Sequence, residues 1–219
     1  MELRKPHTLE LEAHDALVVV DVQNDFLPGG SLAVPHGEEV VPVLNRYLSA
    51  FHSRRLAIYA TRDWHPPEHC SFKAQGGIWP PHCVAETLGA QFASDLGLPP
   101  ETTVISKATE LDKDAYSGFE GTDLDARLRD REIKRLFIGG LATDYCVLNT
   151  VKDAIKHGYE VLLLEDAIRA VNVNPDDGLK AEETMQGLGA RPIHFEILAT
   201  RAPPAGSASP EGVEETEEA

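Results

Sequence analysis

The sequence predicts an α/β fold: a three-layer, doubly wound sandwich around a mostly parallel, six-stranded central sheet. Two observations predict it. Six short runs rich in β-branched residues are apolar at nearly every position, which is typical of strands buried on both faces of a parallel sheet. Amphipathic segments lie between most of these runs, and alternating strands and helices indicate helices on both faces of one sheet.

The predicted strands are marked by continuous apolar character, beginning with the run ALVVVD. In chain order they are Ala16–Asp21, Leu56–Ala60, Thr103–Ser106, Arg135–Gly140, Glu160–Leu164 and Pro192–Ile197. Ligands of such folds bind beyond the carboxyl ends of the strands, so we expect the functional residues directly after them. The segments concerned are Asp21–Phe26, Thr61–His65, Lys107 and Ala142–Cys146.

The predicted helices are amphipathic, and two of them carry end signals. Asn174-Pro175 precedes the last helix, and Gly158 follows the third as a helix-ending glycine would. In chain order the helices are Glu38–Arg54, Asp123–Arg131, Thr143–His157 and Asp176–Gly187.

We expect one folded domain, residues 14–198, preceded by an N-terminal arm, residues 1–13. A content of 42% hydrophobic and 26% charged residues is that of an ordinary globular protein. Residues 199–219 are rich in Pro, Ala, Ser and Glu and offer little to bury, so we expect a disordered acidic tail. The segment 61–120 is long and irregular, as the covering of an active site would be.

Charge and cysteine usage exclude several classes of partner. The formal net charge of −16 disfavours nucleic acid and anionic membranes, and it suits a small neutral substrate. No apolar run approaches the roughly 18 residues that a membrane span needs, and the basic start lacks the apolar core of a signal peptide. Three cysteines at irregular spacing indicate free thiols in a reducing compartment. We therefore expect a cytoplasmic protein, and a homo-oligomer is left open.

Three residues at predicted strand ends form a candidate catalytic cluster. Cys146 lies at a strand-to-helix junction, where the helix dipole and free backbone N–H groups favour a thiolate and can bind an oxyanion. Asp21 could shuttle a proton, and Lys107 could stabilise the thiolate and hold the carboxylate. Each alone could instead be structural: a buried small hydrophobe, a loop organiser and a surface lysine. Sequence gives their order along the chain but not their distances.

A second constellation has the composition of a metal site. Asp63 and His65 are two residues apart at a strand end and can therefore face one cation, and His82 would complete the set. Two histidines and one carboxylate suit Zn²⁺, Fe²⁺ or Mn²⁺ with open positions. The alternative is that Asp63 and His65 only order the loop. His69 follows in a Pro-Pro loop without assured helical geometry, which favours a supporting role over ligation.

Several ordered motifs resemble those of the nicotinamidase (pyrazinamidase) branch of the isochorismatase-like hydrolases. They are DVQNDFLPGGSL, TRDWHPPEHCSF, WPPHCV, SKAT, DAYSGFEGTDL and GLATDYCV. The resemblance runs from about Ala16 to Ile197, nearly all of the predicted domain. It implies the isochorismatase-like fold and hydrolysis of nicotinamide to nicotinate and ammonia in NAD salvage, with pyrazinamide as a further substrate.

The resemblance also implies roles for individual residues. Asp21, Lys107 and Cys146 would form a catalytic triad in which Cys146 attacks the amide and forms a thioester. Asp21 would accept and return the proton, and Lys107 would favour the charged pair. The backbone N–H groups of Ala142 and Cys146 would hold the oxyanion, and a non-proline cis peptide would join Leu141 to Ala142.

A divalent metal ion and an aromatic pocket complete what the resemblance implies. The implied metal ligands are Asp63, His65 and His82. The aromatic residues that line the ring pocket in similar proteins are Phe26, Trp79 and Tyr116. The metal would orient the pyridine ring, with zinc favoured and iron or manganese also accepted by this ligand set. Some members add a ligand from the loop where His69 lies, but the loop spacing varies there, so His69 is not carried over.

Two rival functions are weighed against this one. Another amidohydrolase or an isochorismatase of the same fold would lack either the nucleophilic cysteine or the D-x-H…H set, and both are present here. A catalytically silent binding protein would have lost a triad member, and none is lost. A thioredoxin-like role lacks a partner cysteine, and Gly139-Gly140 is no dinucleotide-binding GxGxxG.

Overall fold

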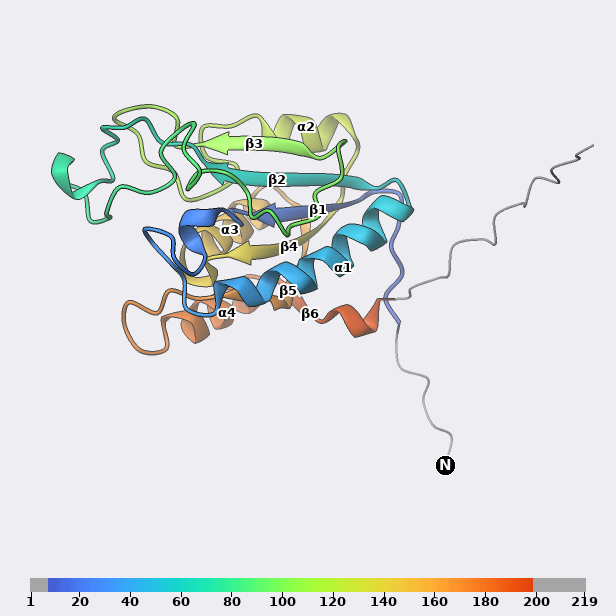
Figure 1. The fold of residues 1–219 in the computed structure, drawn as a ribbon. Helices are drawn as coiled ribbons and strands as arrows, with labels where there is room; N and C mark the ends of the chain where they lie inside the picture. The colour runs from blue at the N-terminus through green and yellow to red at the C-terminus, as the bar shows by residue number, and fades with distance from the viewer. Residues whose placement is uncertain (1–7, 199–219) are drawn as a thin grey trace, which may run out of the picture.

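The computed structural model describes residues 8–198 and contains one six-stranded sheet, in which every pair of neighbours is parallel (Figure 1). The strand order is β3-β2-β1-β4-β5-β6. The strands are β1 (Asp15–Val20), β2 (Ala57–Asp63), β3 (Thr103–Lys107), β4 (Arg135–Leu141), β5 (Glu160–Arg169) and β6 (Arg191–Ile193). The predicted doubly wound fold is confirmed, and the sheet is wholly parallel.

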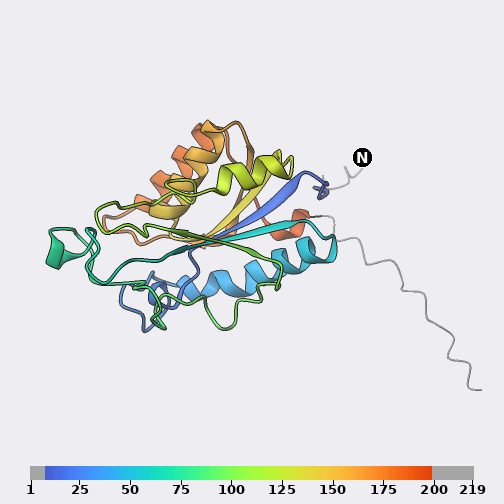
Figure 2. The same cartoon turned by 90° about the horizontal axis from the view of Figure 1, so that it is seen from above.

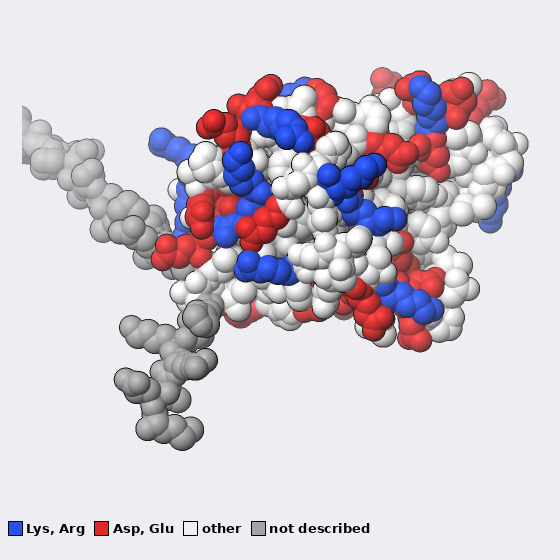
Figure 3. Space-filling view, turned by 180° about the vertical axis from the view of Figure 1, so that it is seen from behind, with Lys and Arg blue, Asp and Glu red and all other residues white. Residues whose placement is uncertain are grey.

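Helices cover both faces of this sheet and complete the three layers. They are α1 (Val40–Ser53), α2 (Leu124–Asp130), α3 (Leu148–Lys156) and α4 (Asp177–Gly187). Figure 2 shows α1 alone on one face, with α2, α3 and α4 on the other. On the face of these three helices, basic and acidic side chains are interspersed rather than separated by sign (Figure 3).

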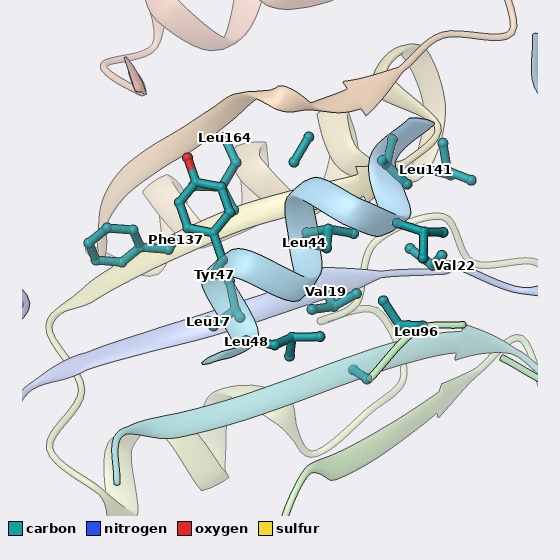
Figure 4. Packing of buried hydrophobic residues seen from close by; sticks show 14 of the residues in the cluster. Leu17, Val19, Val22, Leu44, Tyr47, Leu48, Leu96, Phe137, Leu141 and Leu164 are labelled. Carbon is teal, nitrogen blue, oxygen red and sulfur yellow. The ribbon is translucent and has the colours of Figure 1, made fainter. Parts of the chain in front are cut away.

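The hydrophobic core divides into two layers because successive side chains of a strand point to opposite faces. Leu17 and Val19 of β1 pack toward α1, whereas Val18 packs with the residues of α2 and α3. The buried residues of α1 recur about once per turn and are Val40, Val41, Leu44, Tyr47, Leu48, Ala50 and Phe51. This stripe faces the sheet, as the spacing of an amphipathic helix requires (Figure 4).

Several predicted boundaries were wrong, chiefly at strand ends. β2 runs on to Asp63 and β3 to Lys107. Both residues are polar, yet they pair with each other in the ladder between the two strands. β5 extends to Arg169 past a register irregularity opposite β4, whereas β6 is only three residues long and a 3₁₀ turn follows it. The predicted third helix begins as a π-helical turn, Thr143–Val147, before α3 starts.

The sheet has its topological switch point between β1 and β4, where the chain order reverses. The two strands lie close together at their carboxyl ends, where Val20 pairs with Gly140. Gly140 has φ of +127°, and a Cβ on it would lie 2.1 Å from the carbonyl oxygen of Val20. Only glycine permits this approach, which brings the segment after β4 beside the segment after β1.

The described part of the predicted N-terminal arm, residues 8–13, packs against the folded domain. Leu9 pairs with Leu198 at the other end of the described chain, and its N–H donates to the carbonyl of Ile197 at 2.7 Å. Leu9 and Leu11 also pack against the core. The predicted disordered tail and the first seven residues lie outside the described residues. Among residues 8–198, no helix has the length and apolarity needed to cross a membrane.

Candidate active site

The three predicted catalytic residues converge at the carboxyl edge of the sheet. Asp21 directly follows β1, Lys107 ends β3, and Cys146 lies in the π-helical turn after β4. All three side chains are buried. The parallel sheet brings them together because every strand delivers its carboxyl end to the same edge.

Lys107 is the centre of the cluster. Its Nζ lies 3.0 Å from Oδ2 of Asp21, 2.5 Å from Oδ1 of Asp63 and 3.5 Å from the Sγ of Cys146. It also donates to the carbonyl of Ala115 at 3.2 Å. The direct pairing of Asp63 with Lys107 in neighbouring strands explains the contact with Asp63, whereas Asp21 follows β1, on the other side of β2. A buried ammonium with two carboxylate partners is the electrostatic anchor of the site.

The charges in this cluster follow from burial and from Lys107. Burial would lower the pKa of Lys107, but Asp21 and Asp63 outweigh it and raise that pKa well above its usual range. Burial would raise the pKa of Asp63, yet Lys107 and His65 hold it below its usual range. For Asp21, burial prevails over Lys107, and the pKa is raised.

The surroundings of Cys146 oppose the thiolate that its place before a helix favours. Burial raises the pKa of its thiol well above the usual range, and the nearby Lys107 offsets this only in part. Desolvation therefore favours the protonated thiol over the thiolate. A base must remove that proton before the sulfur can attack, and Asp21 lies close enough to do so, with sulfur and carboxylate oxygen within 4.8 Å.

Thr61 is a site residue that sequence reasoning missed. Its hydroxyl donates to Oδ1 of Asp21 at 2.6 Å, and both side chains are buried. Oδ2 of Asp21 forms the ion pair with Lys107 but has no hydrogen-bond partner, so it is the oxygen open to a proton. The only signal was the position of Thr61 two residues before Asp63, on the strand that neighbours β1.

The predicted metal ligands Asp63, His65 and His82 also come together. Ligand atoms of all three lie within 4.8 Å of one another, and all three residues are buried. His65 Nδ1 lies 3.2 Å from the carbonyl of Ala108, and His82 Nδ1 lies 2.9 Å from that of Pro80. These contacts orient each ring so that Nε2 is left for a metal.

The donor set fits a divalent metal ion. His65 Nε2 is buried without a hydrogen-bond partner, which is costly unless something else satisfies it. Burial lowers the pKa of His82 and keeps its ring neutral, the form that binds metals. A second triplet, Asp21, Asp63 and Cys146, also has ligand atoms within 4.8 Å, but the Lys107 ammonium contacts all three and already supplies their cation.

His69 packs beside the candidate metal ligands, and its ring nitrogens contact other groups. Its ring stacks on that of His65, with centroids 4.3 Å apart. Its Nδ1 contacts the hydroxyl of Ser71 at 2.8 Å, and its Nε2 contacts the carbonyl of Lys113 at 3.0 Å. Both ring nitrogens are therefore engaged elsewhere, in keeping with the supporting role that the sequence favoured.

A cavity opens onto the sulfur of Cys146. It encloses about 370 Å³, including its mouth, and the lining includes the predicted pocket residues Phe26, Trp79 and Tyr116 as well as Ala142, Asp63 and His82. The lining residues that sequence reasoning missed are Leu32, Val34, Tyr145 and Val171. A mostly apolar wall with a few polar groups at one end suits a flat, largely apolar ligand with a polar substituent.

Three aromatic side chains form one wall of this cavity. Trp79 Nε1 donates to the hydroxyl of Tyr116 at 2.9 Å, and the ring of Tyr145 packs edge-on against Trp79 with centroids 5.1 Å apart. Tyr145 directly precedes Cys146, so the same turn carries the sulfur and part of the wall. The peptide bond between Leu141 and Ala142 is cis, as the resemblance implied. The use of the backbone N–H groups of Ala142 and Cys146 as an oxyanion site stays a prediction.

Comparisons with known proteins identify the family of this chain. Residues 15–195 match the family described as the isochorismatase domain. A nicotinamidase of Escherichia coli (strain K12) is 41% identical over 196 residues, covering 80% of this chain and 92% of that protein. A nicotinamidase/pyrazinamidase of Mycobacterium tuberculosis is 37% identical over 179 residues, covering 78% and 94%.

Solved structures show the same fold. The crystal structure of the pyrazinamidase of Pyrococcus horikoshii in complex with zinc has a TM-score of 0.80 at 50% identity, covering 83% of this chain and 99% of that one. PnC1 from L. infantum in complex with nicotinate has a TM-score of 0.80 at 35% identity, covering 88% and 98%. The chain therefore belongs to the isochorismatase family and, within it, to the nicotinamidase (pyrazinamidase) branch of amidohydrolases.

Proposed function

We propose that this protein hydrolyses nicotinamide to nicotinate and ammonia through a thioester on Cys146. One observation carries the proposal: Cys146, whose thiol lies beside a buried ammonium and a buried acid, lines a cavity with aromatic walls. The relatives named nicotinamidase support the choice of substrate. A pyrazine carboxamide has the same flat shape and the same reacting group, so pyrazinamide is a further substrate.

The reaction follows from the groups around the sulfur. Asp21 accepts the thiol proton, and the sulfur of Cys146 bonds to the carboxamide carbon while the C=O π electrons move to oxygen. The N–H groups of Ala142 and Cys146 hold that oxyanion. Collapse breaks the C–N bond, and the leaving nitrogen takes the proton from Asp21 and departs as ammonia. The acyl group remains on sulfur as a thioester.

Hydrolysis of the thioester reverses the proton path. Asp21 removes a proton from water, whose oxygen attacks the acyl carbon, and the thiolate leaves and is reprotonated. Throughout, Lys107 supplies the positive charge that offsets each anionic state of the sulfur and of Asp21. This is the reason for an ammonium in contact with both groups.

Asp63, His65 and His82 would hold one divalent metal ion at the side of the cavity. When bound, it would supply Lewis acidity to the ring nitrogen of the substrate, which would orient the ring and withdraw electron density from it. Zinc is our choice because this ligand set suits it and because a related pyrazinamidase was solved with zinc. Asp63 contacts Lys107 and is itself one of the proposed metal ligands, so it links the position of the ring to that of the triad.

The cellular role that we propose is deamidation of nicotinamide for NAD salvage in the cytoplasm. The net charge of −16 leaves a neutral carboxamide free to approach, whereas a polyanion would be repelled. Neither a nucleic-acid nor a membrane partner is part of the proposal, and assembly into a homo-oligomer is compatible with it.

The test is ammonia release from nicotinamide by the wild type and by Cys146→Ala, combined with mass spectrometry of quenched reactions. We expect an acyl adduct on the wild type, none on the variant, and loss of at least about 10³-fold in kcat. Cys70→Ala is the matched control because Cys70 does not line the cavity, and its activity should be unchanged. Substantial turnover by Cys146→Ala that disappears with a chelator would instead favour attack by a metal-bound hydroxide.

A further inference from the structure

The short segment after β1 is joined to the long excursion between β2 and β3. The N–H groups of Asn24 and Asp25 donate to the carbonyls of Gln91 and Gly89, at 2.9 and 3.0 Å. The N–H of Ala93 donates back to the carbonyl of Val22 at 3.0 Å. The excursion carries two of the three proposed metal ligands and contains little regular structure of its own. Its shape near the metal site therefore depends on contacts with this segment.

The amide of the Gln23 side chain forms hydrogen bonds to backbone groups of Asp63 and Ala90. It is fully buried, and its Nε2 donates to the carbonyl of Asp63 at 2.8 Å and to that of Ala90 at 2.9 Å. The N–H of Asp63 donates to Oε1 of Gln23 at 2.8 Å. Both backbone groups of one metal ligand are thus bonded to one rigid amide, which fixes the direction in which the Asp63 carboxylate leaves the strand.

The Asp25 side chain holds the segment that carries His82. Its Oδ2 accepts from the N–H of Cys83 at 2.7 Å, and its Oδ1 accepts from Ser31 at 3.2 Å. The carbonyl of Cys83 in turn accepts from the N–H of His65 at 3.0 Å. One carboxylate therefore positions the residue next to His82, and that residue is bonded to His65.

The Asp25 carboxylate can reach the N–H of Cys83 only because residue 89 is a glycine. A Cβ on residue 89 would lie 2.1 Å from Oδ2 of Asp25, so the carboxylate reaches Cys83 only past a glycine. Gln23 directly precedes a short 3₁₀ turn, Asn24–Phe26, and Asp25 lies within it, with Asp21 two residues before Gln23. A single segment thus carries the proposed base and the supports of all three proposed metal ligands.

We infer that Gln23 and Asp25 are positioning residues that set the spacing of Asp63, His65 and His82 around a divalent ion. The inference rests on the metal site of the proposed function. Neither side chain lines the cavity, and neither offers an atom to the metal triplet. A metal site tolerates only small errors in ligand distance, about 0.2 Å, so the backbone that carries the ligands must be held firmly.

The experiment measures metal affinity directly. Full-length wild type, Gln23→Met and Asp25→Asn are stripped with a chelator and titrated with Co²⁺, followed by its visible absorption, and then with competing Zn²⁺. Gln23→Met keeps the length of the side chain but removes all three bonds, and Asp25→Asn removes the charge and one acceptor. We expect metal affinity to fall about 10- to 100-fold for Gln23→Met, as for other groups that orient metal ligands, and less for Asp25→Asn. The Co²⁺ absorption should change in shape as well as in the concentration at which it saturates.

Asn45→Ala is the matched control. Asn45 supports the same excursion in the same way, with Nδ2 donating to the carbonyl of Asp95 and Oδ1 accepting from Gly97, both at 2.8 Å. It supports a part of the excursion without metal ligands, so its variant should lose thermal stability but keep the wild-type Co²⁺ affinity. If Gln23→Met and Asp25→Asn behave like this control, with a lower Tm and metal affinity within twofold of wild type, the inference is wrong.

The outcome separates this inference from the proposed function. Wild type that binds Co²⁺ but releases no ammonia from nicotinamide would overturn the proposed function and leave the positioning role to be judged from the variants. Wild type that hydrolyses nicotinamide, with variants that bind Co²⁺ equally well, would overturn the positioning role alone. Wild type that binds no Co²⁺ would overturn the positioning role whatever its activity. If Gln23→Met does not fold, Asp25→Asn against Asn45→Ala decides.

Discussion

Replacing Lys107 by methionine tests whether one ammonium holds the site together. Lys107→Met keeps an unbranched side chain of similar length but removes the positive charge that lies 3.0 Å from Asp21 and 2.5 Å from Asp63. Both carboxylates are buried, so the loss leaves two anions without their partner. Breaking a buried ion pair from one side costs about 3–5 kcal/mol, a large part of the roughly 5–15 kcal/mol by which a domain is stable.

The loss should depend on pH, because Asp21 can escape it by taking a proton. Burial already raises the pKa of Asp21, and Lys107 is the main group that opposes the rise, so the pKa climbs further in the variant. The folded variant then binds a proton that the unfolded chain, with an aspartate pKa near about 3.9, releases. Its stability consequently falls as pH rises between these two pKa values, by up to about 1.4 kcal/mol per pH unit. The destabilisation is larger at pH 8 than at pH 5.

The assay is equilibrium unfolding in urea at both pH values, with chelator present, for wild type, Lys107→Met and the double variant Lys107→Met/Asp21→Asn. The double variant should recover part of the loss at pH 8, because it no longer buries a second unpaired anion. Lys113→Met removes an exposed lysine that is paired with Glu110 and should change nothing measurable. A loss below about 1 kcal/mol at pH 8, or a loss that does not vary with pH, would refute this account of the cluster.

Two further substitutions test other parts of the structure. Thr61→Val removes the hydroxyl that donates to Asp21 and that lowers the pKa of this carboxyl in the wild type. Such a bond to a charged group is worth about 1.5–3 kcal/mol, so its loss should raise the pKa of Asp21. The acid limb of kcat/KM should therefore move up by about one pH unit or more. An unshifted pH profile of ammonia release would contradict the role of Asp21 as base. Arg135→Lys breaks the two-point pairing with Asp15, with both N–O distances at 2.7 Å, at the end of β1 away from the site. It should lower the free energy of unfolding by about 1 kcal/mol and leave kcat/KM unchanged. A change in kcat/KM would contradict the expectation that this ion pair acts on stability alone.

Local patterns predicted the fold, and motifs predicted the residues that converge in the candidate site. The β-branched runs identified all six strands because burial on both faces leaves a continuous apolar signature. The ends of β2 and β3 were placed too early, because Asp63 and Lys107 are polar and yet still pair in the ladder. The π-helical turn before α3 has no sequence pattern of its own, so the start of that helix was also wrong.

Motifs named the residues of the cluster, but only packing decided how they interact. That Lys107 joins two carboxylates and a sulfur depends on the register between β2 and β3 and on the close approach of β1 to β4 at Gly140. The contributions of Thr61 and Tyr145 were missed because each acts through a neighbour on another element. The upward shift of the Cys146 pKa could not be read from the sequence for a related reason, since desolvation is a property of the surroundings.

By itself the sequence determined which chemical groups the protein has and on which side of a parallel sheet they fall, because strand pattern and residue order are local properties. Tertiary structure decided the distances between these groups, their charges and the supports that hold them. Gln23 illustrates the difference: in the sequence it is one polar residue in a loop, and in the fold its amide bonds to both backbone groups of Asp63, forty residues away. Hydrogen bonding and electrostatic energy depend on separation in space, which chain order alone does not specify.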